Sequence, residues 1–239
     1  MVTTFQEHAR TLRVAPDAQE RCWINVISPT HTELQRLERT FGIPMEFLTA
    51  ALDPDERARM ELEDGFHLIL LRIPFRDNET EIPYYTHPLA IILGETIVLT
   101  ICTIESSVIS DFIETKIKNF TIESHSRFVL QIFYRTSLKY LKFLKEIERE
   151  TTAIEQQLHT SLQNEELLRL LRYEKSLVYF TTSLRSNHLM MERLKRTSFL
   201  RLAIDDRELL EDVIIDNSQA IEMANIHSNI LSGLMDAYA

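Results

Sequence analysis

Hydrophobic and polar residues follow two different patterns along the chain, and the change falls near Ser124. Before it, apolar runs of strand length are separated by proline, glycine, aspartate or asparagine, and the runs cover 22–28, 65–75, 86–94 and 96–102. Short apolar runs bounded by turn residues predict buried strands. Gly94-Glu95 predicts a tight turn between the last two strands, and a weaker hairpin is expected over 5–15.

Helical patches lie between these runs. Leu34, Leu37 and Phe41 share one face of a segment that opens with two candidate caps, Ser28 and Thr30. Shorter helices are expected over 45–52 and 106–120. Strands that alternate with helices indicate an α/β layer structure with a mostly buried sheet.

After Ser124 the chain has no proline and one glycine. The apolar positions now recur with helical spacing and predict three long helices, over about 126–161, about 165–195, and from Asp205 or Asp206 to the end. The last helix would be about 50 Å long, which is longer than the α/β part alone can cover. It is therefore either part of a helical hairpin packed on the sheet or a stalk that assembles with copies of itself. We expect an α/β domain over 1–124, a helical hairpin over 125–204 and a stalk helix over 205–239.

The last helix carries two lines of evenly spaced residues. An apolar line has the alternating spacing of four and three that is typical of a coiled-coil seam, and it comprises Leu210, Ile214, Asn217, Ile221, Ala224, Ser228, Leu231 and Met235. Because this seam is apolar, we expect the chain to associate with itself. Beside it, Glu222, Asn229 and Asp236 recur every seven residues. In a parallel bundle of copies they would form stacked polar rings suited to a cation path; alternatively they are solvated surface residues.

Composition excludes several classes of function. A net charge of −10 argues against nucleic acid as a partner. With four scattered glycines, the chain cannot build a phosphate-binding loop or a nucleophile elbow, and no HExxH motif is present. Cys22 and Cys102 are expected to be buried and reduced. The apolar runs are too short for a membrane helix. Ser-His-Asp and Cys-His sites stay open, because their residues assemble in space and not along the sequence.

Three segments in order resemble the cytosolic part of the CorA family of divalent-cation transporters. They are "CWINVISPTHTELQRLERTFGIP" at 22–44, "LDPDERARMELEDGFHLILLRIP" at 52–74 and "LLEDVIIDNSQAIEMANIHSNILSGLMDAYA" at 209–239. The third segment is similar to that family's long stalk helix, which leads into its first membrane helix. The family's Gly-Met-Asn triplet lies beyond the last residue of this chain.

The resemblance implies an α/β/α sandwich followed by a pair of long helices and a stalk helix that lines a funnel in a homopentamer. It also implies passage of Mg²⁺ or a related divalent ion, regulated by divalent ions bound between cytosolic domains. A protein of this kind is expected to be neither an enzyme nor the holder of an organic cofactor. This chain would be the cytoplasmic portion of a cell-membrane protein, attached to the membrane through C-terminal helices that the chain lacks.

The regulatory metal site is the point at which the sequence departs from the family pattern. Thr49 and Ala50 stand where members with a characterised sensor carry an acidic pair. The stalk aspartate that faces this pair would fall near Ile215. Because Mg²⁺ prefers carboxylate and water oxygens, the metal-ligand candidates in this sequence are Asp53, Asp205, Asp212 and Asp216, together with Asp55, Glu56 and Asp206. Helix capping and solvation are the alternative roles for these residues.

Three other interpretations stay open at this stage. The zinc-transporting ZntB branch shares the architecture, and His227 on the stalk is one nitrogen ligand that zinc would favour. A stand-alone cytosolic helical scaffold, without a membrane part, is a second alternative. A hydrolase built on the α/β layer is the third.

Overall fold

The computed structural model of the chain describes residues 1–8, 11–18, 20–77, 79–114, 117, 120–160 and 164–238. In this part of the chain, one mixed sheet has the strand order β2-β1-β3-β7-β6-β5-β4. Neighbouring strands are antiparallel except β3 and β7, which run parallel. The strands are β1 Val2–His8, β2 Thr11–Val14, β3 Cys22–Ile27, β4 Arg59–Glu63, β5 Phe66–Arg76, β6 Tyr84–Leu93 and β7 Ile97–Cys102.

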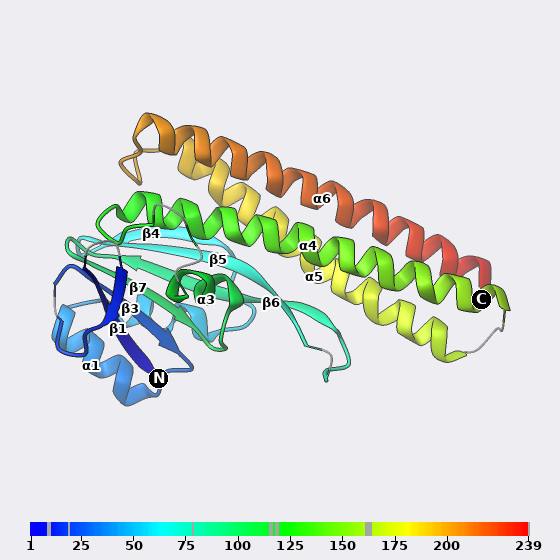
Figure 1. Cartoon of the computed structure of the whole chain (residues 1–239), viewed down its shortest axis with the longest axis horizontal. Helices are drawn as coiled ribbons and strands as arrows, with labels where there is room; N and C mark the ends of the chain where they lie inside the picture. Colours follow the sequence, from blue (N-terminus) through cyan, green and yellow to red (C-terminus); the bar gives the residue numbers. More distant parts are fainter. Residues whose placement is uncertain are drawn as a thin grey trace.

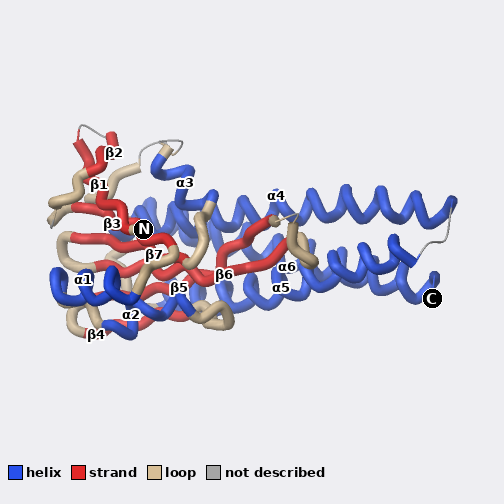
Figure 2. Tube along the Cα trace, turned by 90° about the horizontal axis from the view of Figure 1, so that it is seen from below, coloured by secondary structure: helices blue, strands red, loops and turns tan. Residues whose placement is uncertain are grey.

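Helices cover both faces of the sheet (Figures 1 and 2). The helices α1 (His31–Phe41) and α2 (Met45–Thr49), with the short 3₁₀ turn η1 (Ala50–Leu52), pack on one face. The other face packs against α3 (Ser107–Ile113), α4 (His125–Thr160) and α5 (Asn164–Arg196). The predicted α/β/α sandwich is therefore confirmed.

The central strands are buried on both faces, as their continuous apolar runs predict. Every residue of β7 is buried, and alternate positions enter different cores: Val98 packs toward α4, whereas Leu99 packs toward α1 and α2. Three buried polar side chains of β3 and β7 are linked by hydrogen bonds, and the first runs from Trp23 Nε1 to Thr100 Oγ1 at 2.8 Å. The Thr100 hydroxyl in turn donates to Asn25 Oδ1 at 3.0 Å. The capping candidate confirmed in α1 is Thr30, whose Oγ1 accepts from the backbone of Glu33 at 3.2 Å.

The structure adds one strand that the pattern does not predict. Of the five residues in β4, Met60 is the buried one. The strand forms because its backbone pairs with β5 from Arg59↔Leu70 to Glu63↔Phe66. The predicted helix over 106–120 is α3, which ends at Ile113; positions 115, 116, 118 and 119 lie outside the described residues, as do 161–163 and 239.

The long helices α4, α5 and α6 (Ile204–Tyr238) lie side by side and extend past the sheet (Figures 1 and 2). The chain reverses between α4 and α5 and again before α6, so α6 runs antiparallel to α5 (Figure 1). None of the helices in the described segments is long and apolar enough to cross a membrane.

The apolar seam of α6 corrects one expectation. We expected this seam to need a second copy, but within one chain it is already covered. Leu210, Asn217, Ala224 and Leu231 are at most 2% exposed. Ala224 and Leu231 share a cluster with residues of α4 and α5 that include Ile147 and Leu177, and Leu210 shares another cluster with Leu194 of α5. The seam is thus the inner face of a three-helix bundle, and it gives no reason for self-association.

Candidate functional site

The face of α6 opposite the buried seam carries the predicted polar line. Glu222, Asn229 and Asp236 are all exposed, and their spacing of seven residues keeps them on one side of the helix. Apolar side chains share this outer face, since Ile215, Ile226 and Ile230 are more than half exposed. A row of exposed isoleucines between acidic residues is unusual for a helix surface that meets only water.

Along one flank of α6, residues spaced seven apart each contact a side chain of α5. Lys195 Nζ lies 2.9 Å from Glu211 Oε1, and His188 Nδ1 lies 3.4 Å from Ser218 Oγ. Arg185 Nη2 donates to Asn225 Oδ1 at 3.4 Å, and Ser232 Oγ donates to Glu174 Oε1 at 2.9 Å. In these four contacts, residue numbers increase along α6 as they decrease along α5. The contacts thus define the register of two antiparallel helices.

The other flank of α6 carries an acidic pair. Asp212 and Asp216 lie one and five positions after Glu211, about 100° and 140° further round the helix. Neither has a Lys, Arg or His nitrogen within 4 Å among the described residues. Partial burial, followed by the charge of Asp212, raises the pKa of Asp216 above its ordinary value. These two predicted metal candidates lie about one turn apart on the same flank of α6.

The remaining acidic candidates are separated from this pair. Asp53 is exposed in the turn after η1, and its Oδ1 accepts from the backbone N–H of Asp55 at 2.9 Å. Asp205 is exposed in the first turn of α6. Its neighbour Asp206 is buried and accepts from Arg127 Nη1 of α4 at 2.8 Å. Asp53 therefore stabilises a turn, and Asp206 joins the first turn of α6 to α4.

Thr49 and Ala50 supply no carboxylate to a cation. The hydroxyl of Thr49 donates to the carbonyls of Met45 at 3.0 Å and Glu46 at 3.3 Å within its own helix. Ala50 is buried. Within the described ranges, no cluster of three or more His, Cys, Asp or Glu side chains is arranged to hold a metal ion. A complete metal site in this part of the chain would therefore need groups from outside it.

The structure also shows a polar junction that the sequence analysis missed, where the long β5–β6 hairpin meets the helical bundle (Figure 1). Arg76 Nη1 donates to Glu146 Oε2 of α4 at 3.0 Å. The side-chain Oδ1 of Asn187 in α5 accepts from the backbone N–H of Arg72 at 2.9 Å, and its Nδ2 donates to the Arg72 carbonyl at 2.8 Å. These residues are far apart in sequence and follow no shared spacing, so no local signal identifies them.

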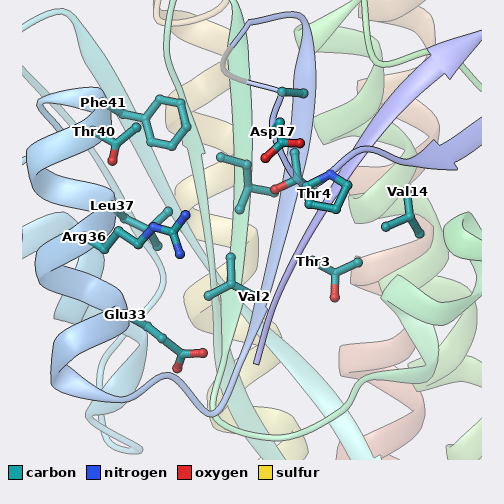
Figure 3. A pocket seen from close by; sticks show the side chains of 13 residues that line it. Val2, Thr3, Thr4, Val14, Asp17, Glu33, Arg36, Leu37, Thr40 and Phe41 are labelled. Carbon is teal, nitrogen blue, oxygen red and sulfur yellow. The ribbon is translucent and has the colours of Figure 1, made fainter.

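A separate cavity lies beside α1 (Figure 3). It has a volume of about 580 Å³ and opens between α1 and the β1–β2 hairpin, with Val2, Leu37, Phe41 and Arg36 among its walls. Glu33 and Asp17 stand on different sides of it (Figure 3). No residue of the acidic pair or of the polar line on α6 lines this cavity.

Comparisons with known proteins give a consistent picture. A family model described as CorA-like Mg²⁺ transporter protein matches residues 18–239. The cobalt/magnesium transport protein CorA of Methanocaldococcus jannaschii is 29% identical over 218 residues, which are 90% of this chain and 68% of that protein.

Two solved structures from the same organism extend the comparison. The complete CorA magnesium transporter aligns with a TM-score of 0.86 at 25% identity, over 100% of this chain and 76% of that one. The soluble domain of CorA aligns with a TM-score of 0.85 at 25% identity, over 99% of this chain and 95% of that one. The fold described above is therefore the fold of this soluble domain.

Proposed function

The chain belongs to the CorA-like Mg²⁺ transporter family, and from this premise we propose that it forms the cytoplasmic part of a channel for Mg²⁺ or Co²⁺. This is a family of transporters, so the hydrolase and scaffold alternatives are set aside. The relative at 29% identity is named for cobalt and magnesium, which favours these ions over zinc as the cargo. The channel would stand in the cell membrane as a homopentamer, with this part on the cytoplasmic side.

The observation that carries the proposal is the exposure of Glu222, Asn229 and Asp236 on a helix whose opposite face is filled by α4 and α5. In a closed ring of copies, this outer face of α6 would line the common axis. The three side chains would then form rings of carboxylate, amide and carboxylate oxygens.

The electrostatics of such rings favour a divalent cation. Two carboxylates about 8 Å apart repel by about 0.5 kcal/mol in water and about 2 kcal/mol near a protein surface. A divalent cation on the axis offsets that repulsion for every copy at once. Mg²⁺ keeps most of its waters and uses one or two carboxylates, so exposed Glu222 and Asp236 rings suit a hydrated ion in passage.

The regulatory ion is the finer part of the proposal. Asp212 and Asp216 are adjacent and have no cationic partner within the described chain. We infer that a counter-ion acts at this pair in the assembled protein, with a divalent cation that retains several waters as one form of it. Asp53 is a weaker candidate because it accepts a hydrogen bond within a turn. Asp205 is weaker because the carboxylate next to it, Asp206, is already paired with Arg127.

Cation flux tests the axial lining. In the complete transporter, Asp236→Ala and Glu222→Ala together should reduce Mg²⁺ uptake several-fold, because both carboxylate rings are removed. Glu148→Ala is the matched control, since Glu148 is an exposed carboxylate on α4. Uptake that both variants leave equally unchanged would demote Glu222 and Asp236 to solvated surface residues. Uptake measured with Zn²⁺ in place of Mg²⁺ distinguishes the zinc alternative.

A further inference from the structure

The outward face of α5 carries a second stripe, of apolar and basic residues that are exposed to solvent. Leu171, Val178 and Leu189 are exposed at successive steps of seven and eleven residues, and Leu189 is 71% exposed. Lys175, Arg185 and Arg193 lie on the same side and are also exposed. Side chains with this spacing form a continuous stripe along a helix.

Arg193 is one of two basic residues of this stripe, with Lys175, for which the described residues show neither an ion pair nor a side-chain hydrogen bond, and it is the one nearest the start of α6. Its neighbours are engaged, since Lys195 pairs with Glu211 and Arg196 pairs with Glu192. Arg193 has no carboxylate within 4 Å among the described residues. The free flank of α6 shows the opposite imbalance, because Asp212 and Asp216 have no cationic partner.

The register between α5 and α6 places these charges at the same height along the bundle. Residue 195 lies opposite 211, and residue 188 lies opposite 218. Arg193 is therefore level with the stretch from Asp212 to Asp216, although it points to a different side of the bundle. Within one chain the two sets cannot meet, because Asp212 and Asp216 lie on the flank turned away from α5.

The exposed apolar residues of α5 and α6 also lie at matching heights along the bundle. The contact between Glu174 and Ser232 extends the register to the far end of the bundle. Val178 then lies level with the exposed pair Ile226 and Ile230, and Leu189 lies level with Ile215. A copy related by rotation about an axis along the bundle keeps every residue at its own height, so these levels also match between copies.

We propose that the outer stripe of α5 docks on the free flank of α6 in a second copy of this chain, where Arg193 reaches Asp212 and Asp216. The occupant is a second copy because charge and apolar positions on the two surfaces complement each other at matched heights. The two surfaces differ, so the contact is head-to-tail, and repeating it by pure rotation about one axis closes a ring. This inference rests on the proposed assembly. It also names the counter-ion of the acidic pair as a guanidinium of the neighbouring copy, which leaves a divalent cation there as a competitor.

Cysteine cross-linking of this chain tests the geometry. The native thiols of Cys22 and Cys102 are buried, and burial raises the pKa of each to about 11, so they stay unreactive. A mixture of the single variants Val178→Cys and Ile226→Cys should form covalent dimers on mild oxidation, whereas each variant alone should not. Equal cross-linking of Val178→Cys with itself, or no dimer at millimolar protein concentration, would overturn the proposal.

Charge exchange tests the role of Arg193. Arg193→Asp should slow the cross-linking roughly tenfold, because a carboxylate would then face two others. Combining it with Asp212→Arg and Asp216→Arg should restore the rate. Arg39→Asp on α1 is the matched control, and it should leave the rate unchanged. A combined variant no faster than Arg193→Asp alone, with an unchanged melting profile, would remove Arg193 from the contact.

The readout separates this inference from the transport proposal. Cross-linking reports on the α5–α6 contact and needs no cation flux. If the dimers fail to form while Asp236→Ala and Glu222→Ala still reduce uptake, the docking geometry is wrong and the axial lining stands. If the dimers form and uptake is unaffected, the docking stands and the lining is wrong.

Discussion

The two flanks of α6 both carry residues at heptad spacing, but only one flank has partners within the described chain. The flank toward α5 has a partner at every step from Glu211 to Ser232. On the other flank, Asp212 and Asp216 lack a cationic partner in the described chain, and Ile226 is more than half exposed. The comparison teaches that periodicity shows which residues align along a helix, while packing decides whether the chain itself covers them.

The largest expected effect compares two neighbouring residues of α6. Leu231→Ala should lower the free energy of unfolding by about 2–5 kcal/mol, because Leu231 is 2% exposed and the variant leaves a cavity between helices. Ile230→Ala should change it by less than about 1 kcal/mol, because Ile230 is 52% exposed. Chemical denaturation of both variants measures the difference. Equal losses would mean that the inner and outer faces of α6 are wrongly assigned.

A smaller effect is expected at the first turn of α6. Asp206→Asn should cost about 1–3 kcal/mol, because it removes the buried carboxylate that accepts from Arg127 at 2.8 Å. Asp205→Asn should be close to neutral, since Asp205 is exposed. Thermal unfolding at neutral pH compares the two. A neutral Asp206→Asn would show that this ion pair does not anchor α6 to α4.

Two asparagines of α6 give a third matched pair. Asn217 is buried, and its Nδ2 donates to the carbonyl of Leu184 at 3.0 Å. Asn217→Ala should cost about 1 kcal/mol through the lost hydrogen bond. Asn229→Ala should leave the free energy of unfolding unchanged within about 0.5 kcal/mol, because its side chain is exposed. If Asn229→Ala proved the more destabilising, the amide on the outer face would have a structural role within one chain.

The strands could be predicted to the extent that burial determines their sequence. β7 is apolar because both of its faces are covered, so Ile97–Cys102 is recognisable from composition alone. β4 is not, because among its residues Met60 is the one that is buried and the rest of the strand is charged or exposed. Its pairing with β5 is made by backbone hydrogen bonds. Because these bonds do not depend on the type of side chain, they leave no pattern in the sequence of β4.

The candidate site was only partly predictable for a related physical reason. The spacing of Glu222, Asn229 and Asp236 correctly predicted that they share one side of a helix, since that follows from helix geometry. The apolar seam was correctly recognised as a seam, but its partner was wrongly assigned to another copy. Whether Leu210 or Leu231 meets α5 or a second chain depends on where the chain reverses, and the pattern of a single helix carries no information about that.

The smallest effect tests the free flank itself, through the pH dependence at Asp216. Its pKa is raised above the ordinary value of 3.8 by partial burial and by Asp212, so the folded chain binds more protons than the unfolded chain as the pH falls toward that value. Ionised Asp216 therefore destabilises the single chain at neutral pH, and the penalty disappears at low pH.

Asp216→Asn should consequently stabilise the single chain slightly at pH 7, by less than about 0.5 kcal/mol, and should give no gain at pH 3. In the docked assembly the sign reverses, because the carboxylate then has Arg193 of the neighbouring copy as its partner and the amide weakens the contact. Thermal unfolding of dilute chain and the cross-linking rate of concentrated chain measure the two states. A variant that stabilises both states would show that no cationic partner reaches this flank, and that the acidic pair meets solvent there.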